Sequence, residues 1–142
     1  MENNSLQRKK ISPQEVERAL GKAYKCLKAA ELLLKKDVDE SVFKEAYDAM
    51  LLAGRALMFS LGLRPRTVGS HTITINFCWE YLGADFKTLI EKFRKMKKKR
   101  NYLVYGIGLV ISRTEAENAL KTAKEFVGKI SKLIQKKSPQ KN

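Results

Sequence analysis

The chain has 142 residues, of which 44% are hydrophobic and 31% charged, with only 3 prolines and 8 glycines. This composition is that of one packed globular domain, and it excludes a chain that is disordered over most of its length. Lysine and arginine number 29 against 15 acidic residues, a net charge of +14 that favours acidic partners, nucleic acid first among them. A lysine-rich surface that only keeps the protein soluble is the alternative.

Cysteine usage and the N-terminal residues bear on the cellular compartment. Cys26 and Cys78 are too few for a disulfide scaffold, and neither has a neighbour at metal-ligand spacing, so we expect reduced, partly buried thiols. The first ten residues, "MENNSLQRKK", lack the apolar stretch of a signal peptide, and the longest apolar stretch of the chain contains Asp48 and Arg55. We therefore expect a soluble cytoplasmic protein with no membrane span and no cofactor.

The first predicted element is a helix that begins at residues 12–15 and ends near Lys36. The sequence "SPQE" combines a serine cap, a proline at the first helical position and a glutamate three residues after the cap, which is a capping box. Residues 1–11 before it are polar and are expected to be frayed. One buried face is predicted by apolar residues that recur at spacings of three and four: Val16, Leu20, Ala23, Tyr24, Leu27, Ala30 and Leu34.

A second helix is predicted after "DVDE" at 37–40, whose acids offer a helix cap. The sequence that follows, 41–63, is apolar on nearly all sides, so we expect it to be the central helix. Asp48 and Arg55 are the only charges between residues 46 and 61, and their separation of seven places them on one side of this helix. They either form a structural ion pair, with each other or with Arg100, or they line a ligand site.

Residues 62–69 form a predicted loop, and "HTITINFCWEYLG" at 71–83 follows it. We interpret this stretch as a short helix that Ser70 and His71 cap and begin; a strand is the alternative, but no second alternating segment is available to pair with it. His71 is the only histidine, so one chain cannot form a histidine-containing metal cluster. Any histidine general base must be His71, although no neighbouring acid marks it as one and a structural role is favoured.

A fourth helix is predicted after a cap at Asp85, and its end carries the basic run "RKMKKKR" at 94–100. Six basic side chains in seven residues are dense enough to bind phosphate but cannot all share one helix face. The alternative is a solvated helix end that its positive charge stabilises. The candidate ligand contacts of this stretch, with an aromatic side chain that can stack on a base, are Arg94, Lys97, Lys98, Lys99 and Tyr102.

The sequence "YGIG" at 105–108 is expected to be a flexible joint, because it lacks the lysine and spacing of a phosphate loop. A second capping box, "SRTE" at 112–115, opens a last helix with a continuous apolar stripe. The tail, residues 137–142, is expected to be frayed. Together the elements predict an all-α fold, an antiparallel up-and-down bundle of about five helices, in a single domain over residues 1–142.

Three stretches in order, "AYDAMLLAGRALMFSLGLRPRTVGSH", "KRNYLVYG" and "SRTEAENALKTAKEFVGKI", resemble the HEPN domain family of small prokaryotic helical bundles. The resemblance covers most of residues 13–136. It implies a five-helix bundle, a homodimer, a gene paired with a minimal nucleotidyltransferase and, in active members, metal-independent cleavage of RNA.

The characteristic motif of that family is an arginine, a polar residue, a few arbitrary residues and a histidine. Arg100 and Asn101 match its opening, and Tyr105 stands where the histidine would be. If the motif is catalytic in this chain, these three residues carry the chemistry. Tyrosine titrates near a pH of about 10 and is a poor base at neutral pH, so the substitution argues against classical cleavage. Arg100 can still bind phosphate, and Tyr105 can still stack on a base.

Three functional hypotheses follow. The leading one is a helical protein that binds nucleotide or RNA around Arg100 and acts as an accessory or toxin–antitoxin partner of a minimal nucleotidyltransferase. The second is a metal-independent ribonuclease toxin in which Tyr105 or His71 assists Arg100. The third is a purely structural interaction module with a generic surface charge. An apolar second helix and the family resemblance together predict a homodimer.

Overall fold

Five helices make up most of the chain, and they confirm the predicted all-α bundle. The computed structural model describes residues 6–8, 10–106 and 110–137. The stretch 71–83, for which a strand was the alternative, is helical over nearly its whole length. In chain order the helices are α1 (Pro13–Lys35), α2 (Asp39–Ser60), α3 (Ser70–Tyr81), α4 (Lys87–Val104) and α5 (Arg113–Lys137).

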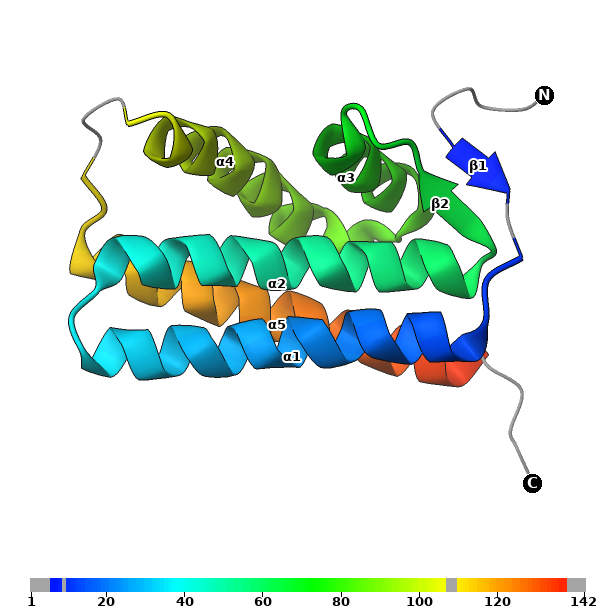
Figure 1. The fold of residues 1–142 in the computed structure, drawn as a ribbon, viewed down its shortest axis with the longest axis horizontal. Coiled ribbons are helices and arrows are strands. Elements are labelled where there is room, and N and C mark those ends of the chain that lie inside the picture. Colours follow the sequence, from blue (N-terminus) through cyan, green and yellow to red (C-terminus); the bar gives the residue numbers. More distant parts are fainter. Residues whose placement is uncertain (1–5, 9, 107–109, 138–142) are drawn as a thin grey trace.

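The arrangement places α2 at the centre, in contact with each of the other four helices. Helices α1 and α2 form an antiparallel hairpin, and α5 packs against both of them (Figure 1). Helices α3 and α4 lie on the other side of α2, where the short α3 packs against both α2 and α4 (Figure 1). The helix that is apolar all round is therefore the one that the other helices surround, as predicted.

The two predicted capping boxes are present and fix where α1 and α5 begin. At α1 the Glu15 amide donates to Ser12 Oγ at 3.3 Å, and the Ser12 amide donates to the Glu15 carboxylate at 3.1 Å. At α5 the Glu115 amide donates to Ser112 Oγ at 3.1 Å, and the Ser112 amide donates to the Glu115 carboxylate at 3.0 Å. Each box satisfies two backbone groups that a helix end otherwise leaves unpaired.

The starts of α2 and α4 differ from the prediction. No side chain caps α2, and Asp37 and Asp39 instead pair with Arg113 at the start of α5, at 2.9 and 3.6 Å. Asp85 does not cap α4: it lies in a 3-10 turn, Ala84–Phe86, and its carboxylate is 3.6 Å from Lys129 Nζ. In both places the acid has a cation within reach on α5, and the charge pair forms in place of the cap.

A short two-stranded ladder lies beside the helices. Strand β1 (Leu6–Arg8) pairs antiparallel with β2 (Leu63–Pro65), with Gln7 opposite Arg64. Residues 6–8 therefore belong to the fold, whereas the sequence predicted a frayed leader over 1–11. Lys137, the first residue of the predicted frayed tail, is instead the last residue of α5. Residues 1–5, 9 and 138–142 of the predicted frayed ends, and residues 107–108 of the predicted joint, lie outside the described part of the chain.

The core is built on α2 and α5, with large side chains from α4 between them. Most of the predicted face of α1 is buried or partly buried, but Tyr24 is 46% exposed, so its place in the predicted stripe was wrong. No helix of the described residues is long and apolar enough to cross a membrane. The largest fully buried side chains are Tyr47, Met50, Leu57, Met58, Ile75, Ile90, Phe93, Phe126 and Ile130.

A glycine on α2 allows α3 to approach closely. A Cβ atom on Gly54 would lie 2.7 Å from Thr74 Cγ2 and 3.3 Å from Cys78 Sγ, both on α3. A real Cβ is essentially never as close as 2.7 Å to another heavy atom, so only glycine fits here without a shift of α3. The contact sets the height of α3 above α2, and with it the position of the residues at the start of α3.

Candidate functional site

The basic run and the residues after it form one continuous helix. Helix α4 extends to Val104, so Arg100 and Asn101 are helical, whereas the sequence predicted a loop after Arg100. The Tyr105 amide donates to the Asn101 carbonyl at 3.1 Å, and Gly106 follows with a left-handed φ of 66°. This is the usual way for a helix to end at a glycine. Because the helix is regular, its basic residues point in several directions.

Arg100 points from α4 onto α2. Its guanidinium carbon lies 5.5 Å from the centre of the Tyr47 ring, and one terminal nitrogen lies 3.9 Å from Asp48 Oδ1. The side chain is only 26% exposed. The buried Nε–H nevertheless has no hydrogen-bond partner in the described structure. An arginine has five N–H donors in a planar fork, and at Arg100 the Nε–H is a donor that the described protein leaves unsatisfied.

His71 lies beside the same tyrosine. The Tyr47 hydroxyl and His71 Nδ1 are 2.9 Å apart, and the two ring centres are 5.7 Å apart. Burial lowers the pKa of His71, and the positive charges of Arg100, Arg55 and Lys97 lower it further. Burial also raises the pKa of Tyr47 above its ordinary value, so its hydroxyl keeps its proton. At neutral pH the imidazole is therefore uncharged and can accept a proton.

Asp48 and Arg55 both lie beside this group of side chains, but they do not pair with each other. The Arg55 guanidinium donates to Ser70 Oγ at 2.9 Å, and Asp48 is the acid that faces Arg100. Burial raises the pKa of Asp48, and this effect exceeds the opposing effect of the Arg100 charge. The ion pair between Asp48 and Arg100 is loose, because the oxygen and nitrogen atoms are 3.9 Å apart. We refer to Tyr47, Asp48, Arg55, His71, Lys97 and Arg100 as the Arg100 cluster.

A basic pocket adjoins the Arg100 cluster. It has a volume of about 220 Å³, lies between α1, α2 and β2, and has Arg55 in its wall. Arg18 and Lys22 of α1 line it, and so does Arg64 of β2, whose guanidinium is 2.6 Å from the Glu15 carboxylate. We call it the α1–β2 pocket. Arg55 is shared by the pocket and the Arg100 cluster, because it lines the pocket and its charge also lowers the pKa of His71.

The structure separates the candidate residues of the basic run. Arg94 donates to Asn76 on α3 at 2.7 Å, and Lys99 pairs with Glu115 on α5, while Lys98 is exposed. Tyr102 and Tyr105 are 40% and 77% exposed at the end of α4. The remaining candidate of the motif, Asn101, is partly exposed. Of the predicted site residues, the structure thus brings together only Asp48, Arg55, Lys97 and Arg100.

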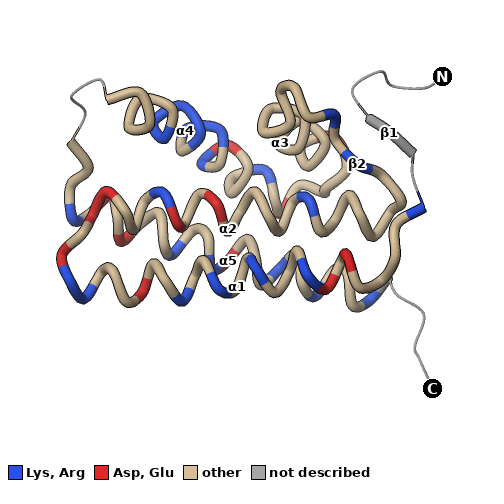
Figure 2. The backbone as a smooth tube through the Cα atoms, viewed as in Figure 1, with Lys and Arg blue, Asp and Glu red and all other residues tan. Residues whose placement is uncertain are grey.

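Sequence reasoning missed the neutral side chains that organise the site and the cations of α1. Tyr47 was not singled out within the apolar second helix, but a tyrosine that is fully buried needs a partner for its hydroxyl, and the only histidine of the chain supplies it. Arg18, Lys22 and Arg64 carried no signal, because their helix and strand are brought together only by the fold. Figure 2 shows how unevenly the cations are distributed, with several lysines and arginines along α4 and along α1, and none on α3.

The described residues contain no group of three or more His, Cys, Asp or Glu side chains that could hold a metal ion. Cys26 and Cys78 are free thiols, and burial raises the pKa of each to about 12, so neither is a reactive thiolate at neutral pH. The groups available for chemistry around Arg100 are therefore guanidinium, imidazole, phenol and carboxyl.

Comparisons with known proteins agree with the fold. A family model described as "HEPN domain" matches residues 16–133, which include the whole of α2, α3 and α4. A comparison with curated proteins gives no match. The family match spans far more than half of the sequence and contains every residue of the Arg100 cluster. The chain therefore belongs to the HEPN domain family.

Proposed function

We propose that this HEPN protein binds single-stranded RNA or a nucleotide at the Arg100 cluster, with Arg100 as the phosphate anchor. The observation that carries the proposal is the state of Arg100: a guanidinium that is largely buried, held over Tyr47, and with an Nε–H that lacks a partner in the described structure. A phosphate would satisfy these donors in a bidentate arrangement.

The positive surface continues on both sides of Arg100. Arg55 leads into the α1–β2 pocket, where Arg18 and Lys22 make no ion pair with a described residue. In the other direction, Tyr102 and Tyr105 are exposed and available for stacking on bases. A strand that follows this surface would place successive phosphates along cations and its bases at the end of α4. Such binding depends on charge and stacking and does not read a particular sequence.

Fluorescence anisotropy with a short labelled single-stranded RNA tests the proposal. Arg100→Ala should weaken binding about 10- to 100-fold, because the interaction of a charged donor with phosphate is lost from a largely desolvated site. Lys98→Ala is the matched control: it removes one cation from an exposed position of the same helix. If the two variants lose affinity equally, general charge accounts for binding and the anchoring role of Arg100 is wrong.

The family and the exposed apolar side chains of the protein support a proposal about its partner proteins. We propose a homodimer that acts as an accessory or toxin–antitoxin partner of a minimal nucleotidyltransferase. Two apolar side chains outside the proposed RNA contacts are exposed, Val104 at the end of α4 at 49% and Val110 before α5 at 82%, and a second copy would cover them. Sedimentation that gives only a 16.2 kDa species at micromolar concentration would contradict the dimer.

Pairing with a nucleotidyltransferase has its own test. The gene for this chain is co-expressed with a neighbouring gene for a small nucleotidyltransferase, and we expect the two proteins to co-purify as a stable complex. A matched protein of similar positive charge serves as the control for non-specific association.

A metal-independent ribonuclease is a second candidate, and His71 is the observation that favours it. A neutral imidazole beside Arg100 can take the proton of a ribose 2′-hydroxyl. The 2′-oxygen would then bond to phosphorus, and the bond to the 5′-oxygen would break. That oxygen would take a proton from water and leave a cyclic phosphate end. Cleavage of total RNA that is lost in both His71→Gln and Arg100→Ala would establish this function, and the absence of cleavage would leave binding alone.

A further inference from the structure

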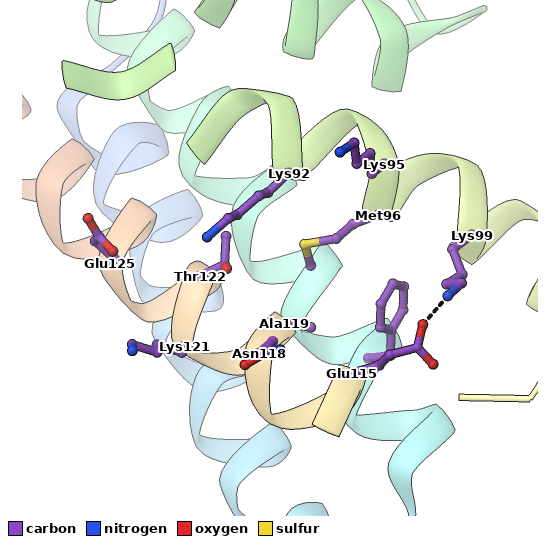
Figure 3. A pocket seen from close by; sticks show the side chains of 11 residues that line it. Lys92, Lys95, Met96, Lys99, Glu115, Asn118, Ala119, Lys121, Thr122 and Glu125 are labelled. Atoms are coloured by element: carbon purple, nitrogen blue, oxygen red, sulfur yellow. Dashed lines mark hydrogen bonds and ion pairs between the residues drawn. The ribbon is translucent and has the colours of Figure 1, made fainter. Parts of the chain in front are cut away.

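A second pocket lies on the opposite side of α4. It has a volume of about 450 Å³, and it is lined by Phe43 of α2 and by residues of α4 and α5, which Figure 3 shows facing one another. None of the residues of the Arg100 cluster lines it. We call it the α4–α5 pocket. Its volume is within the range of sites for small ligands, roughly 300–1,000 Å³.

The inner wall of this pocket is apolar, with the hydroxyl of one threonine in its lining. Met96 of α4, Ala119 of α5 and Phe43 are all buried and line it. Thr122, which also lines the pocket, is only 6% exposed, and its hydroxyl makes no hydrogen bond to another described residue. The hydroxyl is therefore available to hydrogen-bond to a ligand in the pocket. Asn118 adds an amide to the same lining.

The rim of the pocket is positive. Lys92, Lys95 and Lys121 line it and make no ion pair with a described residue. Lys99 is different, because it pairs with Glu115 and closes one end of the pocket (Figure 3). The only other acid in the lining is Glu125. The unpaired lysines outnumber it, so the mouth of the pocket attracts an anion.

We propose that the α4–α5 pocket binds a nucleoside monophosphate, separately from RNA at the Arg100 cluster. A base is flat and apolar on its faces, which suits the wall of Met96 and Phe43, and its edge carries the donors and acceptors that Thr122 lacks in the protein. The phosphate lies at the rim with Lys92 and Lys121, whose flexible side chains reach it as point charges. The site does not depend on the proposed binding of RNA, because the two sites share no residue.

Methionine NMR gives a direct readout of occupancy. The chain has 4 methionines, of which Met96 lines the pocket while Met50 and Met58 are fully buried elsewhere in the core. Adenosine monophosphate, titrated at low salt into protein labelled at the methionine methyl groups, should shift the Met96 signal saturably and leave those of Met50 and Met58 unchanged. Adenosine alone and inorganic phosphate alone should each bind more weakly, since each has only half of the contacts.

Two matched threonine variants identify the site. Thr122→Val keeps the shape of the side chain and should weaken binding about three- to tenfold through the loss of one hydrogen bond. Thr114→Val makes the same change at an exposed position of α5 and should have no effect. Lys121→Ala should weaken the binding of the monophosphate but not that of adenosine. These changes lie at the rim or are isosteric, and a thermal melt of each variant verifies that it is folded.

Three outcomes would overturn the proposal. The first is that Met96 does not shift saturably. The second is that Thr122→Val and Thr114→Val bind the monophosphate equally well. The third is that Arg100→Ala abolishes binding while Thr122→Val does not, which would place the ligand at the Arg100 cluster. A failure of RNA binding leaves the Met96 signal unaffected, so the two proposals fail separately.

Discussion

The two sides of α4 have the same charge and different chemistry. On the side of α2 and α3, Arg100 is largely buried, with its guanidinium over the Tyr47 ring and its charge close enough to lower the pKa of His71. On the side of α5, flexible lysines surround an apolar pocket. A planar guanidinium held in place suits one phosphate in one orientation, whereas ammonium groups on long side chains adapt to a ligand that other contacts position. The comparison teaches that a dense basic run is not one site.

The cause of the division is the helix period. Successive residues of a helix are rotated by about 100°, so residues 97 and 100 face one way while 92, 95 and 99 face another. An apolar row between them, with Phe93 and Met96, holds the helix against α2. The basic run at 94–100 is therefore divided between two sides of the folded helix. The fold therefore converts one sequence feature into two surfaces.

The largest expected effect concerns the contact that holds α3 in place. Gly54→Ala should destabilise the protein by about 1–3 kcal/mol, because the new methyl group overlaps Thr74 across a packed interface. Gly128→Ala in α5 is the matched control, since its Cβ would meet nothing within 4 Å, and it should stabilise the protein by about 0.5–1 kcal/mol. Urea unfolding of both variants measures the difference. A stabilised Gly54→Ala variant would show that α3 does not approach α2 so closely.

Removing the acid of the Arg100 cluster should strengthen RNA binding. Asp48→Asn keeps the size of the side chain and removes the charge that competes with phosphate for Arg100, so affinity should rise by about two- to fivefold. Asp37→Asn is the control, because Asp37 pairs with Arg113 at the far end of α2 and its side chain is 87% exposed. Anisotropy titrations compare the two. Weaker binding by Asp48→Asn would mean that Asp48 positions Arg100 for the ligand.

Salt dependence should distinguish two neighbouring lysines of α4. Lys97 faces His71, whereas Lys99 is already paired with Glu115. If RNA lies at the Arg100 cluster, Lys97→Ala should flatten the plot of log affinity against log salt by about 0.7, the value for one phosphate contact to a single strand. Lys99→Ala should leave the slope nearly unchanged. Equal slopes for the two variants would contradict the assignment of RNA to that side of α4.

The smallest expected effect is on the titration of His71. Its pKa in the folded protein is lowered, first by burial and then by Arg100, Arg55 and Lys97. The unfolded chain therefore binds more protons than the folded protein below the ordinary pKa of about 6.5. Stability should fall as the pH is lowered through about 6.5, and it should level off below the folded-state pKa. Unfolding at several pH values, compared with His71→Gln, measures the contribution.

Because the chain has one histidine, its imidazole signals in NMR report the pKa directly. Arg100→Ala should move that pKa upward, towards the ordinary value, by removing a nearby positive charge. A folded-state pKa above 6.5 in the unmodified protein would contradict the burial of His71 among cations.

The fold could be predicted from local sequence signals. The capping boxes at Ser12 and Ser112 and the apolar periodicity are local, and they led to the number of helices and the family. Errors arose where a distant residue competed with a local one. Asp85 suits a helix cap, but Lys129 on α5 lies within reach of it. The pairing of residues 6–8 with 63–65 has no local pattern either, because each strand has only three residues.

The candidate site was predicted less completely, for the same reason. Asp48 and Arg100 stood out as charges in unusual places, and the structure does bring them together. The hydrogen bond between Tyr47 and His71 depends on how α3 lies on α2, and the glycine at 54 that permits this approach is visible in the sequence only as a missing side chain. The lining of the α4–α5 pocket is harder still to predict from the sequence, because its residues have the pattern of any two amphipathic helices.

The strand pair also has a consequence for the order in which the chain folds. Residues 6–8 can pair with 63–65 only after α1 and α2 have formed their hairpin and brought the two segments together. Closing so long a loop for a ladder of three residues is entropically unfavourable, so the ladder forms late and opens first. The segment 63–65 leads directly into the turn before Ser70. Assembly thus proceeds from the helical hairpin outward, and a fusion placed before residue 6 would adjoin the last part of the molecule to fold.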